Sequence, residues 1–310
     1  MLKGLLDDLR ERMCCPSCRK SLVWLVDEVR CENCGQTFPI FEGVPILVSR
    51  ENSVFDASSI VKASGTLTKK RGLRRLVPSI SLNASASRCY SHLRQLLVVL
   101  GPTSCVLVVG GGEGGVSSKA LEDESIEIIV SDIAIAPTTH ICLDAHAIPF
   151  IDGSFDAIVA QAVLEHVVDP AQCVREFHRV LRPGGLVYAE TPFMQQVHMG
   201  AYDFTRFTLL GHRRLFRQFE EVESGVSVGA GSALAWSLVY FLTSFSWNTA
   251  SRRILNVGAR FAFFWFKYFD LVIRSRVAAN DAAAGVYFLG RRAESMLSDR
   301  ELLKEYKGAI

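Results

Sequence analysis

The stretch "CVLVVGGGEGG" at residues 105–115 decides the fold expected for this chain. Apolar residues run straight into glycines, which predicts a buried parallel strand that ends in a loop. Glycines let the backbone approach a ligand closely at the amino terminus of the next helix. Glycine-rich loops also form ordinary turns. The segments that follow this loop indicate whether it binds a ligand.

Strands and helices alternate after the glycine loop. The next strand, "IEIIVSD", ends in Asp132, about twenty residues beyond the glycines, where a carboxylate can meet a ribose hydroxyl. The stretches 126–132, 140–150, 154–167, 186–193 and 220–229 are each expected to supply a strand, that in 140–150 ending at Asp144 and that in 154–167 just before Gln161. Helices are expected over 87–100 and 169–185. This order predicts an open α/β sheet with ligands at the carboxyl ends of its strands.

The successive motifs "VLVVGGGEGG", "SD", "LDAHAIPFIDGSFDAIVAQAVLEHVVDP" and "VLRPGG" resemble those of class I S-adenosylmethionine-dependent methyltransferases of the type 11 group. The similarity covers about 87–225 and a late strand at 284–292. The resemblance implies a Rossmann-like, seven-stranded methyltransferase sheet whose last strand is antiparallel. It also implies a cofactor site in which Gly110, Gly112 and Gly114 surround the methionine, Asp132 meets the ribose, Asp144 and Ala145 lie near the adenine, and Gln161 lies beside the methionine.

One position departs from the family pattern. The family usually has an acid two residues before the first glycine, and this chain has Val108 there. The loss would weaken cofactor binding, and it supports an alternative in which the chain is a non-catalytic scaffold with a methyltransferase fold. Because Asp132 and Asp144 are both present, we expect a working enzyme that uses S-adenosylmethionine.

Candidate acceptor-side residues lie in "PFMQQVHMGAYDFTRFT", residues 192–208. This stretch resembles a His…Asp-aromatic-x-Arg-aromatic-Thr pattern common in such methyltransferases. His198 suits a general base, and Arg206 either clamps an anionic group or pairs with Asp203. The alternative is a loop held by an Asp203–Arg206 pair, with His198 merely on the surface. His166, in "LEHV" at the pocket rim, is often structural in related enzymes.

Two Cys-x-x-Cys pairs near the amino terminus predict a metal site. Cys15 with Cys18, and Cys31 with Cys34, would present four thiolates to one structural zinc ion. Residues 10–48 resemble the zinc ribbon of activators of tRNA methyltransferases. Cys14 is out of phase and is interpreted as a bystander. The first residues lack the apolar core of a secretory signal, so a reducing, cytoplasmic location is expected.

An apolar insertion, residues 226–277, precedes the last expected strand. Its first part carries no charge, and its second part is rich in aromatic residues. The bases Arg253, Arg260, Lys267 and Arg274 are spaced by seven, which on one helix would form a narrow basic stripe. Such a helix fits peripheral contact with the headgroup layer of the inner membrane face. A lid over the pocket or a dimer contact is the alternative.

Together these features predict a zinc ribbon over 1–50, a linker over 51–86, a methyltransferase domain over 87–292 and a tail over 293–310. The expected acceptor is amphiphilic: a lipid-linked glycan, a glycolipid or a quinone. The alternative is an RNA methyltransferase that binds RNA through the ribbon and the basic cluster at 69–75. The apolar insertion disfavours binding to nucleic acid. The acceptor atom and the oligomeric state stay open.

Overall fold

The computed structural model describes residues 9–49, 54–64, 76–112 and 120–309. Two features expected from the sequence lie outside these residues: Gly114 of the glycine loop and the basic cluster at 69–75.

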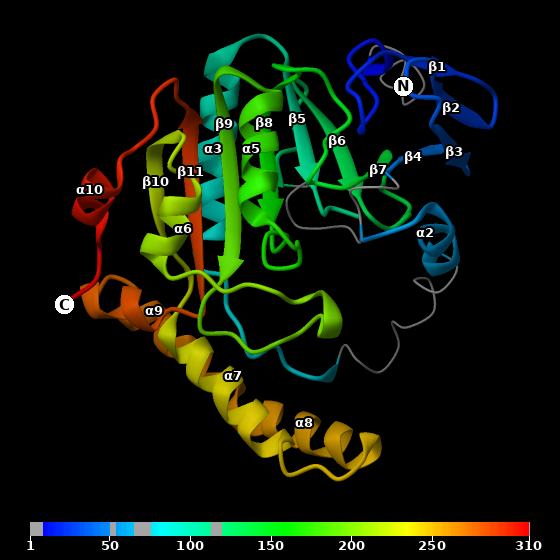
Figure 1. Ribbon diagram of the computed structural model, residues 1–310. Coiled ribbons are helices and arrows are strands. Elements are labelled where there is room, and N and C mark those ends of the chain that lie inside the picture. Colours follow the sequence, from blue (N-terminus) through cyan, green and yellow to red (C-terminus); the bar gives the residue numbers. More distant parts are fainter. Residues whose placement is uncertain (1–8, 50–53, 65–75, 113–119, 310) are drawn as a thin grey trace.

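A twisted sheet forms the body of the molecule (Figure 1). Its strands are β5 (Ser104–Val109), β6 (Ile126–Asp132), β7 (Ile141–Leu143), β8 (Phe155–Gln161), β9 (Leu181–Pro192), β10 (Phe219–Val228) and β11 (Gly285–Arg292). They lie in the order β7-β6-β5-β8-β9-β11-β10, and β11 runs antiparallel to both of its neighbours. The expected Rossmann-like α/β sheet with an antiparallel last strand is thus confirmed.

Two helices pack on opposite sides of the sheet centre. Tyr90, Leu93 and Leu97 of α3 (Ala86–Leu100) share a core with one face of β5, and Cys173 and Phe177 of α5 (Pro170–Val180) share a core with the other face. The α5 helix starts at Pro170 after Asp169, whose side chain accepts a hydrogen bond from the Gln172 amide. Since α5 ends at Val180, the Pro-Gly-Gly turn expected to close the helix lies inside β9 instead.

The ribbon extends the main sheet. Its strands β1 (Leu22–Trp24), β2 (Glu28–Cys31), β3 (Thr37–Phe41) and β4 (Val44–Leu47) form an antiparallel meander. The last of them pairs in parallel with β7, with Ile46 opposite Cys142, so one sheet of eleven strands results. The seven strands expected from the sequence are therefore only part of a longer sheet. Arg19 also pairs with Glu176 of α5 at 2.9 Å.

The insertion forms a helical hairpin, α7 (Ala230–Thr243) and α8 (Thr249–Phe263), followed by the 3-10 helix η4 (Phe264–Phe269) and the short helix α9 (Asp270–Ile273). Figure 1 shows it beyond the arrowheads of β5, β6, β8 and β9, the carboxyl edge of the sheet. None of the helices in the described parts of the chain is both long enough and apolar enough to cross a bilayer.

The basic stripe expected on one long helix is wrong, because α8 ends at Phe263. Arg260 donates to the Pro78 carbonyl and Lys267 to the Ser79 carbonyl, at 3.3 and 2.8 Å. Asp270, expected on the same polar side, is buried against the first turn of α7. It accepts hydrogen bonds from the amides of Gly231 and Ser232, at 2.7 and 3.2 Å, and from the Ser232 hydroxyl at 2.6 Å.

The remaining elements join these parts. The expected linker contains α2 (Ala57–Ser64), and its later part packs on the hairpin, where Ile80 is buried with Ala235 and Val239. The other short helices are η3 (Gly200–Tyr202), α6 (Leu209–Leu215), η5 (Val277–Ala282), α10 (Asp299–Leu302) and η6 (Leu303–Glu305).

Candidate functional site

The start of the glycine loop is fixed against the end of β6. Asp132 accepts hydrogen bonds from the Gly112 amide, at 2.9 Å, and from the Ala134 amide, at 3.0 Å. Gly110 has a positive φ of 73°, and a Cβ there would lie 2.4 Å from the Val163 side chain. Only glycine fits this position without strain. Gly110 and Gly112 therefore lie at the carboxyl end of β5, where the sequence predicts the cofactor loop.

The other predicted cofactor residues lie along the same edge of the sheet. Asp144 and Ala145 follow β7 and are nearly buried. Asp144 accepts hydrogen bonds from the amide and the Nδ1 of His146, at 2.9 and 2.6 Å. This ion pair raises the pKa of His146. The geometry brings Gly110, Gly112, Asp132, Asp144 and Ala145 to one edge, and their contacts with a cofactor stay predictions.

Gln161, at the end of β8, belongs to a buried polar network. Its amide donates to Glu190 at 3.1 Å, and its carbonyl accepts from the Tyr90 hydroxyl at 3.0 Å. Glu190 also accepts hydrogen bonds from Asn83 and Tyr188. Burial raises the pKa of Glu190. Val108, where the family pattern has an acid, is fully enclosed in the core beneath the loop.

The predicted acceptor-side residues lie together after β9. Arg206 forms a two-pronged ion pair with Asp203, with Nη2 and Oδ2 2.8 Å apart. It also donates to the carbonyls of Gln195 and Gln196. The Arg206 hydrogen bond holds the pKa of Asp203 well below its usual range. Of the two roles expected for Arg206, the structure shows the pairing, which shapes the loop that carries His198.

His198 faces a second histidine and a buried acid. The rings of His166 and His198 meet edge to face, with centroids 4.7 Å apart. Glu165 Oε1 lies 3.7 Å from His166 Nε2 and 4.0 Å from His198 Nε2. Burial raises the pKa of Glu165 to about 8 and lowers that of His166.

Glu165 was missed at the level of sequence. In the motif "LEHV" only His166 was considered a candidate. The sequence around Glu165 does not show that this side chain approaches His198 on the loop after β9. Its only signal was its position just after β8, at the edge where ligands bind.

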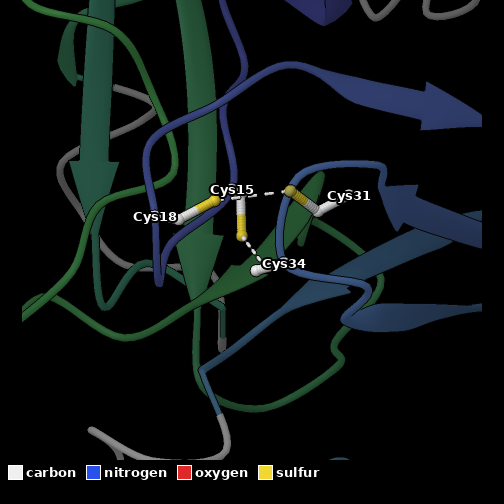
Figure 2. A group of neighbouring side chains, drawn as sticks. All are labelled: Cys15, Cys18, Cys31 and Cys34. Carbon is white, nitrogen blue, oxygen red and sulfur yellow. Dashed lines mark hydrogen bonds between the residues drawn. The ribbon is translucent and has the colours of Figure 1, made fainter.

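The four ribbon cysteines converge (Figure 2). All four sulfur atoms lie within 4.8 Å of one another, with Cys15 and Cys34 3.6 Å apart and Cys18 and Cys31 3.4 Å apart. None of the nine cysteines is in a disulfide. Four convergent thiol groups fit the tetrahedral, all-cysteine ligand arrangement of structural zinc.

The comparisons with known proteins find similarity to methyltransferases. Residues 107–189 match the family model described as "Methyltransferase domain". A ubiquinone/menaquinone biosynthesis C-methyltransferase of Pseudoalteromonas translucida is 30% identical over 125 residues, which are 34% of this chain and 50% of the relative. A demethylmenaquinone methyltransferase of Renibacterium salmoninarum is 28% identical over 174 residues, 51% of this chain and 72% of the relative. The chain spans half the length of the first of these relatives.

Among solved structures, phosphoethanolamine N-methyltransferase 2 of Haemonchus contortus, in complex with phosphomonomethylethanolamine and S-adenosylhomocysteine, aligns over 67% of this chain and 53% of its own. The sequence identity is 14% and the TM-score 0.44. The family match and the strand order together support the class of S-adenosylmethionine-dependent methyltransferases. The resemblance of the ribbon to the tRNA methyltransferase activator stays a prediction.

Proposed function

We propose that this chain transfers a methyl group from S-adenosylmethionine to an amphiphilic acceptor, of the quinone, glycolipid or lipid-linked glycan kind, at a membrane face. The observation that carries the proposal is the contact between the acceptor-side loop and the hairpin. The Tyr240 hydroxyl of α7 donates to the Val197 carbonyl, and Gln196 donates to Ser237 at 3.2 Å. The loop with His198 is therefore built on the apolar insertion.

For methyl transfer, the protein mainly has to position the acceptor in line with the methyl group. The acceptor atom attacks the methyl carbon in line with the departing sulfur, so the sulfonium becomes a neutral thioether. A hydroxyl or amine acceptor must also lose a proton. Neutral His166 donates from Nδ1 to the Tyr202 carbonyl, at 2.6 Å, which leaves Nε2 as its proton acceptor. The cluster of Glu165, His166 and His198 thus offers acceptor-side groups at the carboxyl edge.

The outer surface of the insertion, residues 226–277, supports the membrane part of the proposal. Large apolar side chains are exposed over it, with Trp247 95%, Ile254 73% and Val272 73% exposed. A groove of about 700 Å³ along α8 is lined by Arg252, Arg253 and Arg260. Exposed aromatic residues next to arginines suit the headgroup layer of an anionic membrane. Two of the relatives carry quinone names, and quinones of that kind are amphiphilic.

Calorimetric titration with S-adenosylhomocysteine tests the cofactor. We expect micromolar binding by the wild type and loss of binding in Asp132→Ala, because Asp132 fixes the Gly112 amide and is the acid expected to bind the ribose. Glu294→Ala, an exposed acid on the tail, is the control. A wild type that does not bind the ligand would refute the enzymatic proposal and favour the scaffold.

Flotation with vesicles of phosphatidylcholine and phosphatidylglycerol tests the membrane. The wild type should float, and Trp247→Ser with Ile254→Ser should stay at the bottom, because burying such side chains contributes about 25 cal/mol per Å². The matched control, Val26→Ser with Leu303→Ser, removes similarly exposed apolar side chains that lie outside the insertion. Equal flotation of both double variants would contradict the proposed contact. Transfer of labelled methyl to RNA and not to a lipid extract would favour the RNA alternative.

A further inference from the structure

Glu165, His166 and His198 form a cluster of three possible metal ligands. One ligand atom from each residue lies within 4.8 Å of the others. Glu165 and His166 follow β8, and His198 lies on the loop after β9, so two neighbouring strands bring the three groups together. A carboxylate with two imidazoles is a donor set that divalent first-row metals prefer.

Both imidazoles are oriented by a second contact on the far side of the ring. His166 Nδ1 donates to the Tyr202 carbonyl at 2.6 Å, which directs Nε2 toward Glu165. His198 Nδ1 lies 3.4 Å from Asp203, and its Nε2 also faces Glu165. A carbonyl or carboxylate behind a ligating histidine fixes the ring and its tautomer in metal sites.

The backing groups are themselves held in place. Asp203 accepts the His198 amide at 2.8 Å and is paired with Arg206. The amide of Phe204 donates to the Glu165 carbonyl at 2.8 Å. These bonds tie the loop after β9 to the end of β8, so the three ligating groups are pre-positioned by the backbone.

Glu165 gives an independent indication. Its side chain is fully buried, and neither carboxylate oxygen has a hydrogen-bond partner among the described residues. Buried polar groups are nearly always paired, since leaving a carboxyl group unpaired away from water is costly. Both histidines that face it lie at 3.7 Å or more, beyond hydrogen-bond range and with room for a bridging atom.

We propose that Glu165, His166 and His198 bind one divalent transition-metal ion, such as Fe²⁺, Mn²⁺ or Co²⁺, at the acceptor side of the cofactor edge. Three protein ligands leave coordination positions for water or for an oxygen of the acceptor. This role as an acceptor-binding metal rests on the proposed methyl transfer, whereas metal binding itself does not. A metal-bound His198 cannot be the general base expected from the sequence. A metal-bound Nε2 of His166 likewise cannot accept a proton, so metal binding and base catalysis by these histidines exclude each other.

Titration of the zinc-loaded full chain with Mn²⁺, followed by electron paramagnetic resonance, tests the proposal. Mn²⁺ prefers harder ligands than thiolate, so the ribbon does not compete. We expect one Mn²⁺ per chain and binding about 100-fold weaker or worse in His198→Gln and His166→Gln, since even an outer-shell substitution costs about 10–100-fold. His92→Gln, a histidine paired with Glu223 on another surface, is the matched control and should bind as the wild type does.

Two results would overturn the site. One is a wild type that takes up neither Mn²⁺ nor, in a second titration, Co²⁺ beyond its ribbon equivalent. The other is an unchanged affinity in His198→Gln, whose side chain is a quarter exposed and whose loss the fold should tolerate. S-adenosylhomocysteine binding, measured on the same samples, should persist in every variant. If the wild type does not bind S-adenosylhomocysteine, the proposed methyl transfer is contradicted, and the Mn²⁺ titration still tests the metal site.

Discussion

Asp270 is expected to anchor the helical hairpin to the body of the molecule. The Asp270→Ala substitution removes a carboxylate that is only 2% exposed. It deprives the first turn of α7 of three hydrogen bonds, from two amides and one hydroxyl. A hydrogen bond to a charged group contributes about 1.5–3 kcal/mol and a helix cap about 1 kcal/mol, and such losses are not additive. We expect a net local cost of about 2–4 kcal/mol.

Hydrogen exchange followed by mass spectrometry measures this cost directly. Because about 1.4 kcal/mol is a factor of ten, amides of α7 and α8 should exchange about 30- to 1,000-fold faster in Asp270→Ala, with the core strands β5 and β8 little changed. The Asp270→Asn variant retains the shape of the side chain, so its exchange rates should lie between those of the wild type and Asp270→Ala. Glu294→Ala, which removes an exposed acid, should exchange as the wild type does. Hairpin protection that is unchanged in Asp270→Ala would refute the anchoring argument.

Three further predictions concern the ribbon, a buried histidine and the glycine loop. Cys18→Ser should lower the zinc content measured by atomic absorption from one ion per chain toward zero, while Cys14→Ala, outside the converging set, keeps it. Burial lowers the pKa of His212 to about 3, so below pH 6.5 the unfolded chain binds a proton that the folded chain does not bind. The free energy of unfolding, measured with urea, should therefore fall by about 1.4 kcal/mol per pH unit below pH 6.5. The His212→Phe substitution should reduce that slope. Gly110→Ala should abolish S-adenosylhomocysteine binding in calorimetry, because its Cβ would collide with Val163.

The succession of strands along the chain was predictable, because each strand has its own apolar sequence pattern. The run 126–132 became β6 with those same ends, since an apolar strand closes at a polar Asp132. The late strand expected at 284–292 is one residue longer than β11. Local pattern and tertiary fold agree here, so sequence reasoning succeeds.

The contacts between distant segments were not predictable. "VPIL" at 44–47 is apolar enough for a ribbon strand, but nothing in it indicates pairing with β7. The spacing by seven in 253–274 suggested one helix, yet Asp270 is drawn to the positive end of α7 and the helix stops at Phe263. In the site, Asp203 and Arg206 pair as their spacing allows, whereas the approach of Glu165 to His198 depends on two strands lying side by side.

The pairing of β4 with β7 also bears on aggregation. An exposed β-strand edge offers unpaired amides and carbonyls to other chains. Here the ribbon covers the β7 edge through only two residue pairs, Ile46 with Cys142 and Leu47 with Leu143. If the four ribbon cysteines bind zinc, the metal would supply much of the stability of so small a unit. If so, loss of that zinc would leave most of the large sheet in place and expose the buried, apolar edge of β7. We would then expect the zinc-free protein to self-associate through this edge.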